Sequence, residues 1–342
     1  MADSEILSGR NGALAIIRLN RPKAINALSA GMLAELETLL PQLAEDGGVA
    51  AVMLLGEGER GFCAGGDVRH ARELVLAGRG GEARDYFALE YRVDALIGGF
   101  PKPLVALQHG VVMGGGIGLS APARIRVAVE GARFAMPEPA IGFFADVGVN
   151  YIMRRTLPHL ALLFTMSGAI VGPDDAMALG LTDLILPSQR LPDLPHLVAA
   201  AALEGETAIR RAIASLAVEQ GATPFVDGCD AMESVALATN PVELVTAIEE
   251  AEGDFAGTLA VALRAGCPTT LAANWTDFRA AQKQKSHKDA LAIDLKLAAL
   301  MVERPDFTEG VRAVLVDKDK RPSWFPARIE EVDMARLEAA IV

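Results

Sequence analysis

Apolar residues in the first half of the chain occur in short runs separated by polar and glycine-rich segments. Four such runs predict buried β-strands at residues 14–19 (LAIIRL), 50–55 (AAVMLL), 103–112 (PLVALQHGVV) and 123–129 (ARIRVAV). The segments between these runs are too long for hairpins. They leave room for crossover helices, so the pattern favours a mixed α/β fold.

Two of the intervening segments have helical spacing. Residues 29–46 repeat apolar positions every three to four residues after Ser29, a suitable N-cap. A longer helical stretch is predicted from about Asp67 to about Leu96, with a possible interruption at AGRGGE. Loops that follow strands in such folds are where chemistry is most often found.

Beyond Pro187 strand patterns almost disappear, and segments such as VELVTAIEEAE and ALAIDLKLAALMVER have helical spacing. We therefore expect a catalytic α/β core over residues 1–200 and a helical C-terminal region over residues 201–342.

Composition excludes several classes of protein. The chain has 32 basic and 44 acidic residues, a net charge of −12, which opposes binding to nucleic acid. No apolar run reaches the roughly 18 residues that a membrane span needs. The N-terminus resembles neither a secretory signal nor a transit peptide, so a cytoplasmic location is expected. Cys63, Cys229 and Cys267 are widely spaced and the five histidines show no HExxH pattern, so we expect no disulfide framework and no metal.

The stretch VVMGGGIGLSAP is the most informative glycine run. It matches GxGxxG only in part, because Leu119 stands at the third glycine position, and neither GxxxxGK[ST] nor GxSxG occurs. A glycine run between a strand and a helix also suits an oxyanion site, since its N–H groups are unobstructed. FCAGGD is the candidate for a second such corner. From the residues alone, two tight structural turns remain an equal alternative.

The blocks LNRPKAINALS, FCAGGDVR, HGVVMGGGIGLS and FAMPEPAIGFF occur in this order. Together they resemble the enoyl-CoA hydratase/isomerase (crotonase) superfamily, which implies a spiral of repeated ββα units. MPEPAIGFFADVG and the C-terminal DFTEGVRAVLVDKDKRPSWFPARIEEV resemble its branch of 3-hydroxyisobutyryl-CoA hydrolases.

Two departures from the hydratase pattern point to that branch. Hydratases of the superfamily are expected to carry one glutamate in the glycine block and one in the PE block. Here the first position is Gly118, whereas the second is Glu138. Asp146 stands where a hydratase typically has glycine. The acidic residues therefore differ from those expected of a hydratase and resemble those of the hydrolase branch.

The resemblance implies roles for five residues. The backbone N–H groups of Gly66 and Gly115 would hold the oxyanion, and Glu138 with Asp146 would form the catalytic acid–base pair. Glu90 would bind substrate together with Gly115, Glu138 and Asp146. Glu138 as general base and Glu138 as nucleophile both remain open. The structural alternatives are a solvated loop acid or a helix-capping acid for Glu138, a helix N-cap for Asp146 and a solvated helix face for Glu90.

For coenzyme A, the resemblance implies contacts along the PKAINAL and CAGGD segments. The residues concerned are Lys23, Ala24, Asn26, Ala64 and Asp67. Coenzyme A enters as part of the substrate, so no separate cofactor is expected. Cys63 lies beside these residues with no base in its motif, and we interpret it as a packed side chain.

The implied activity is hydrolysis of 3-hydroxyisobutyryl-CoA to 3-hydroxyisobutyrate and coenzyme A, a step of valine breakdown. An enoyl-CoA hydratase or isomerase is the first alternative. A non-catalytic crotonase-fold protein that binds RNA is the alternative of another class. An acyl-CoA is the expected partner, with no nucleic acid and no membrane. A homo-oligomer is possible, and the role of DKDKRPSW is not fixed by the sequence.

Overall fold

The computed structural model describes residues 4–342, which form two compact units. The first comprises residues 4–66, 89–134 and 171–222, and the second comprises residues 67–88, 135–170 and 223–342. Each unit is thus assembled from three separate segments of the chain. The division expected at residue 200 stays a prediction.

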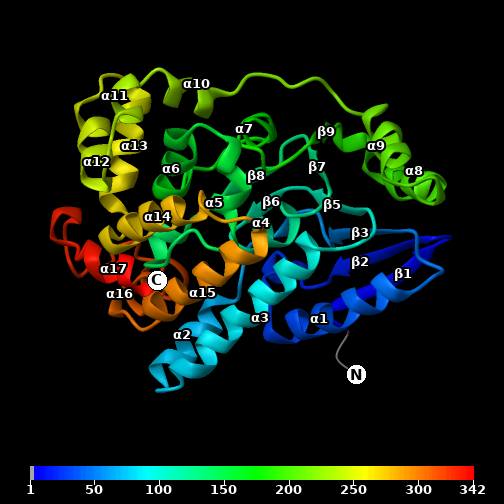
Figure 1. The fold of residues 1–342 in the computed structure, drawn as a ribbon, viewed down its shortest axis with the longest axis horizontal. Coiled ribbons are helices and arrows are strands. Elements are labelled where there is room, and N and C mark those ends of the chain that lie inside the picture. The colour runs from blue at the N-terminus through cyan, green and yellow to red at the C-terminus, as the bar shows by residue number, and fades with distance from the viewer. Residues whose placement is uncertain (1–3) are drawn as a thin grey trace. The chain divides into compact units, whose positions relative to one another are not determined.

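A six-stranded sheet forms the centre of the first unit (Figure 1). Its strands, in spatial order, are β1 (Ile6–Asn11), β2 (Leu14–Leu19), β3 (Ala51–Gly56), β5 (Leu104–Gln108), β7 (Ile125–Val129) and β9 (Leu184–Leu186). β1 and β2 are antiparallel, and all the other neighbours are parallel. The predicted strand at 14–19 is confirmed, and the one at 50–55 is shifted by one residue.

A smaller three-stranded sheet has the order β4 (Gly61–Cys63), β6 (Val111–Met113) and β8 (Arg133–Ala135). The single strand expected at 103–112 is wrong, because its two halves are β5 and β6, which belong to different sheets. Gly110 separates them with a φ of +52°, a left-handed conformation that breaks an extended strand. β6 thereby pairs with β4.

Helices of the first unit include α1 (Ala30–Glu45), α4 (Gly115–Ser120), α7 (Pro173–Ala178), α8 (Leu194–Ala201) and α9 (Glu206–Ala214). The predicted helix at 29–46 is confirmed, and the Ser29 hydroxyl caps it by accepting from Met32 N at 3.1 Å. Figure 1 shows α1 alongside β1 and β2.

One face of the large sheet is packed against α8 and α9. Alternate residues along the strands, such as Leu14 and Ile16, point to this face, as the two-residue period of a strand requires. They meet Val198 from α8, with Ile209 and Ile213 from α9. Ile209 and Ile213 are four residues apart, so they share one face of their helix.

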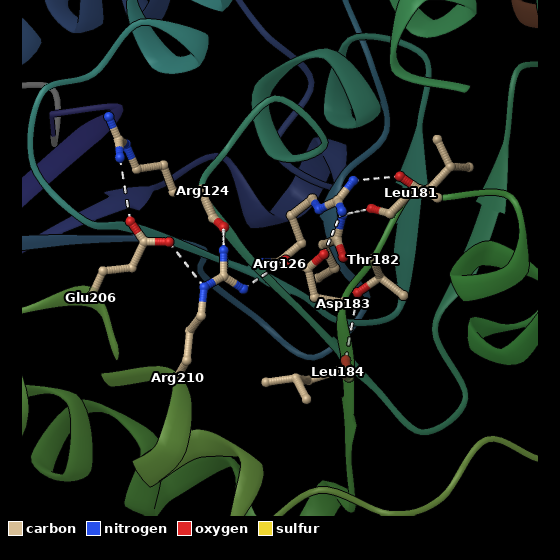
Figure 2. Close-up of polar contacts among 10 residues, drawn as sticks. Arg124, Arg126, Leu181, Thr182, Asp183, Leu184, Glu206 and Arg210 are labelled. Atoms are coloured by element: carbon tan, nitrogen blue, oxygen red, sulfur yellow. Dashed lines mark hydrogen bonds and ion pairs between the residues drawn. The ribbon is translucent and has the colours of Figure 1, made fainter. Parts of the chain in front are cut away.

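Polar contacts tie α9 to β7 and β9 at the edge of this sheet (Figure 2). Asp183 accepts from the backbone N–H of Arg126 at 3.0 Å and forms ion pairs with Arg126 and, at 3.5 Å, with Arg210. Glu206 pairs with Arg210 at 2.9 Å and with Arg124 at 3.3 Å. Two carboxylates, Asp183 before β9 and Glu206 on α9, therefore form ion pairs with three arginines.

The second unit is helical. Its main helices are α2 (Val68–Leu76), the first part of α3 (Gly80–Gly98), α5 (Val149–Ile152), α6 (Pro158–Ser167), α10 (Pro224–Asp230), α11 (Glu233–Ala236), α12 (Pro241–Glu250), α13 (Asp254–Ala265), α14 (Pro268–Ala281), α15 (His287–Val302), α16 (Pro305–Val311) and α17 (Met334–Ala340). The helical character expected of residues 201–342 is confirmed, as is the mixed α/β class. No helix among residues 4–342 combines the length and apolar character that crossing a bilayer requires.

Candidate active site

Two glycine-containing corners lie side by side in the first unit. β4 and β6 are parallel neighbours, so their carboxyl ends meet at the same edge of the small sheet. Gly66 follows β4, and Gly115 follows β6 as the first residue of α4. A Cβ added to Gly65 would lie 3.2 Å from Met113 O and 3.4 Å from Gly115 N, so the two corners are in contact.

The N–H groups of Gly66 and Gly115 take no part in the backbone pairing of the two corners: within residues 4–342, neither donates to a backbone carbonyl. Gly115 is in the first turn of α4, where N–H groups have no partner within the helix. Gly114 before it has a φ of +50°, which glycine adopts readily. This arrangement fits an oxyanion site, and the assignment to Gly66 and Gly115 remains a prediction.

The carboxyl group of Glu90 lies against the Gly115 corner. Glu90 is on the part of α3 that belongs to the first unit and is only 2% exposed. A Cβ on Gly115 would overlap Glu90 Oε1, so the carboxyl occupies the space where a side chain would stand. The solvated helix face considered for Glu90 is therefore wrong.

A second acid near this corner had no signal in the sequence. Asp94 lies one turn after Glu90 on α3 and is fully buried. The charges of both acids act on the thiol of Cys63 and, after burial, help raise its pKa to about 12. A thiol with such a pKa is not ionised near neutral pH, which agrees with the interpretation of Cys63 as a packed side chain.

Four of the five residues predicted to contact coenzyme A lie in the first unit. Lys23 and Ala24 are in a short 3₁₀ turn, and Ala64 N donates to Ile25 O at 2.9 Å. The side chain of Asn26 is buried, and its amide donates to the carbonyls of Glu57, Gly61 and Phe62 at 3.0–3.1 Å. Asn26 therefore holds the loop together. Its N–H donates to Arg21 O at 2.9 Å and its carbonyl accepts from Cys63 Sγ at 3.2 Å, so its contact with coenzyme A stays a prediction.

Asp67 belongs to the second unit, where its carboxylate caps α2 by accepting from His70 N at 3.4 Å. Its own N–H donates to the hydroxyl of Tyr86 at 2.7 Å. The side chain of Asp67 thus has a structural role, and its contact with coenzyme A stays a prediction.

Glu138 lies in an apolar part of the second unit. It begins a 3₁₀ turn over Glu138–Ile141 and is 7% exposed. Phe143 N donates to Glu138 O at 3.2 Å, and Phe143 stacks on Phe87 with centroids 4.6 Å apart. A solvated loop acid, the first structural alternative for Glu138, is therefore wrong. The second, a helix-capping acid, is not seen at this turn, whose N-cap is Pro137 without a side-chain cap.

Asp146 is also buried, with 4% of its surface exposed. The helix after it, α5, starts at Val149 and has Gly148 as its N-cap. The N-cap role considered for Asp146 is therefore wrong. The reason is that Val147 and Gly148 both take left-handed φ values, which separate Asp146 from the helix.

Four polar residues that the sequence did not single out surround the Asp146 segment. They are Asn274 and Asp277 on α14 and His287 and Asp294 on α15. Nothing in the local sequence marks them, since each is a single polar residue in a helix. Among residues 4–342, no group of three or more His, Cys, Asp or Glu side chains could hold a metal ion.

Comparison with known proteins places this arrangement in a family. A family model described as "Enoyl-CoA hydratase/isomerase" matches residues 14–341. The chain belongs to this family, and its fold is the crotonase fold. It is 34% identical to "3-hydroxyisobutyryl-CoA hydrolase, mitochondrial" from Gallus gallus, over 96% of this chain and 86% of that protein. It is 32% identical to "3-hydroxyisobutyryl-CoA hydrolase 1" from Arabidopsis thaliana, over 98% and 91%.

Among solved structures, the chain resembles one titled as a carnitinyl-CoA dehydratase from Mycobacterium thermoresistibile. The TM-score is 0.91 at 33% identity, covering 99% of this chain and 97% of that one. The similar proteins thus share one fold under names that describe different reactions of CoA thioesters.

Proposed function

We propose that this protein is an acyl-CoA thioester hydrolase whose substrate is 3-hydroxyisobutyryl-CoA. The observation that carries the proposal is the set of buried acids. Glu138 and Asp146 are both buried in the second unit, whereas Gly118 on α4 offers no carboxylate. Addition of water to an enoyl group is expected to need the second glutamate that Gly118 replaces. The names of the curated relatives support the same choice.

In the proposed reaction, water adds to the thioester carbonyl, and the carbon–sulfur bond then breaks. The products are the free acid and coenzyme A, which leaves as a thiolate and takes up a proton. The N–H groups of Gly66 and Gly115 stabilise the negative charge on the carbonyl oxygen. Losing one such donor typically costs about 10²–10³ in rate.

Glu138 promotes the attack on the thioester carbonyl in one of two ways. As a general base it removes a proton from the attacking water. As a nucleophile it forms an anhydride that water then hydrolyses. Asp146 contacts the substrate hydroxyl or orients the water, and Glu90 binds the acyl group beside Gly115. In either route the loss of the Glu138 carboxylate should slow hydrolysis strongly.

Assays of single variants test the proposal. Release of thiol from 3-hydroxyisobutyryl-CoA should exceed hydration of crotonyl-CoA. Glu138→Gln and Asp146→Asn should each reduce hydrolysis by about 10²-fold or more, with little change in coenzyme A binding. Glu130→Gln, which changes an exposed acid, is the matched control. Turnover of crotonyl-CoA or carnitinyl-CoA without hydrolysis of the hydroxyacyl thioester would favour the dehydratase alternative.

We further propose a place in valine breakdown, in a reducing compartment such as the cytoplasm. Within residues 4–342 the three cysteines are free thiols, a state that a reducing compartment maintains. Fractionation of the source cells with an antibody to this chain tests the location. Several relatives carry "mitochondrial" in their names, so recovery with mitochondria is the result that would contradict the cytoplasmic assignment.

A further inference from the structure

The turn that follows Asp146 has an unusual backbone. Val147 has a φ of +55° and Gly148 a φ of +69°. A β-branched residue rarely adopts this left-handed conformation, and it does so only where the surrounding structure holds it there. Gly148 has a second constraint, because a Cβ at this position would overlap the ring of His287.

Two side chains of α15 hold the peptide group that joins Val147 to Gly148. The carbonyl oxygen of Val147 accepts from His287 Nε2 at 3.2 Å. The N–H of Gly148 donates to Asp294 Oδ2 at 2.6 Å. Both polar ends of this peptide therefore bond to residues two turns apart on one face of α15. A peptide held at both ends cannot rotate without losing both bonds.

The protonation state of His287 suits this contact. The ring must donate to a carbonyl, so Nε2 carries a proton. Burial lowers the pKa of His287 to about 4, and the ring is neutral at physiological pH.

Asp277 on α14 lies close to Asp294 and bonds to Asn150, a few residues after the Val147–Gly148 turn. Its Oδ2 accepts from the amide of Asn150 at 2.8 Å, and both aspartates are 1% exposed. Burial raises the pKa of Asp277 to about 6. It also raises the pKa of Asp294 well above its usual range, with a further contribution from the charge of Asp277. The buried pair therefore keeps a proton at neutral pH, and a protonated carboxyl resembles an asparagine amide in its hydrogen bonding.

The chain on the other side of Asp146 is held as well. Ala145 N donates to Asn274 Oδ1 at 2.7 Å, and the Asn274 amide donates to Thr165 O at 2.9 Å. The backbone is thus fixed immediately before and immediately after Asp146, while its carboxyl group has no part in these bonds.

We propose that His287 and Asp294 are positioning residues that hold the Val147–Gly148 turn and thereby set the direction of the Asp146 carboxyl group. Their hydrogen bonds described above go to backbone atoms of this turn, and the charge of Asp146 also contributes to the raised pKa of Asp294. Their effect on the reaction would pass through Asp146. This inference rests on the proposed function, in which Asp146 acts on the bound substrate.

Paired substitutions test the inference by rescue. Asp294→Asn keeps an acceptor for Gly148 N–H and places an amide where the protonated carboxyl stood. Asp294→Leu removes the acceptor and leaves no polar group in that place. We expect kcat of Asp294→Leu to fall by about 10- to 100-fold with KM changed by less than about threefold, because misplacing a catalytic group affects the chemical step. Asp294→Asn should keep kcat within about threefold of the wild type.

The same contrast is expected at the other end of the peptide. His287→Gln keeps an N–H donor for Val147 O, whereas His287→Leu does not. Asp289→Asn, an exposed aspartate on the same helix, is the matched control. Near-UV circular dichroism checks that each variant is folded. If Asp294→Leu does not fold, the half-buried His287 gives the deciding comparison.

The outcomes separate this inference from the proposed function. Wild-type kcat in both leucine variants, with Asp146→Asn inactive, would overturn the positioning role alone. Equal loss of kcat in the leucine and the conservative variants would also overturn it. Full activity in Asp146→Asn would remove Asp146 from the proposed reaction, and with it the basis for the inference. Rescue at both positions together with an inactive Asp146→Asn would support it.

Discussion

Gly115 has no side chain at the point where the carboxyl group of Glu90 approaches α4. The glycine therefore gives room to a buried acid. Position 115 has an ordinary helical φ, so space and not backbone conformation excludes other residues there.

Replacing Gly115 with alanine should impair activity more than folding. The added methyl group would displace the Glu90 carboxyl from its buried place, and we expect kcat/KM to fall by about 10- to 100-fold. Gly47→Ala is the control, because a Cβ there would meet nothing within 4 Å. Thiol-release kinetics measure both variants. A Gly115→Ala enzyme as active as the control would mean that this corner does not meet the reacting carbonyl.

Candidate site residues that lie inside sequence motifs could be located from the sequence. The residues that hold the backbone around the candidate site could not. Gly66, Gly115 and Glu138 stand in recognisable blocks. His287 and Asp294 reach the Asp146 turn from a helix more than a hundred positions later. Their spacing of seven residues is ordinary for any helix, so only the tertiary contacts reveal them.

Helices and strands in which apolar residues recur at a regular spacing were predictable from the sequence. Strands that form mainly because they pair with a neighbouring strand were not. β2 and α1 have clear patterns and were predicted. β1 is an exposed edge strand with four successive exposed residues, and β4 and β8 are three residues long. Such strands form because a neighbour offers backbone hydrogen bonds, which a single-sequence pattern does not record.

The polar network beside β9 predicts how firmly α9 is held to the sheet. Asp183→Ala would remove a bond to Arg126 N–H and two ion pairs, with the side chain only 22% exposed. We expect a loss of about 1–3 kcal/mol in the free energy of unfolding. Turnover of the folded protein should be unchanged, since these groups do not touch either glycine corner.

Urea unfolding measures this effect, and Asp193→Ala is the matched control. Asp193 forms an exposed pair with Arg190, its side chain being 53% exposed, so its loss should cost less than about 1 kcal/mol. Equal losses in the two variants would contradict a special role for Asp183.

For the molecule as a whole, the buried acids make stability depend on pH. The pKa of Asp277 rises from its ordinary 3.8 to about 6 in the folded protein. Between these values the folded state holds a proton that the unfolded chain has lost. Stability therefore falls as pH rises through this window, the reverse of a salt-bridged carboxylate.

Asp277→Asn should remove this dependence. Between about pH 4 and pH 8 the wild type should lose stability relative to the variant by an amount on the order of 2 kcal/mol. The half-buried, neutral His287 is present in both proteins, so its own pH effect cancels in the difference. Denaturant unfolding across this range gives the values. A constant difference between the two proteins would show that Asp277 is ionised throughout.

The buried thiol beside the glycine corner has a consequence for chemical durability. With its pKa raised to about 12 by burial, Cys63 is almost entirely protonated near neutral pH. Thiol–disulfide exchange and attack by peroxides both proceed through the thiolate. A hydrolase that liberates a thiol product at each turnover thus keeps next to its proposed site a cysteine that exchanges only slowly with a disulfide formed when that product is oxidised.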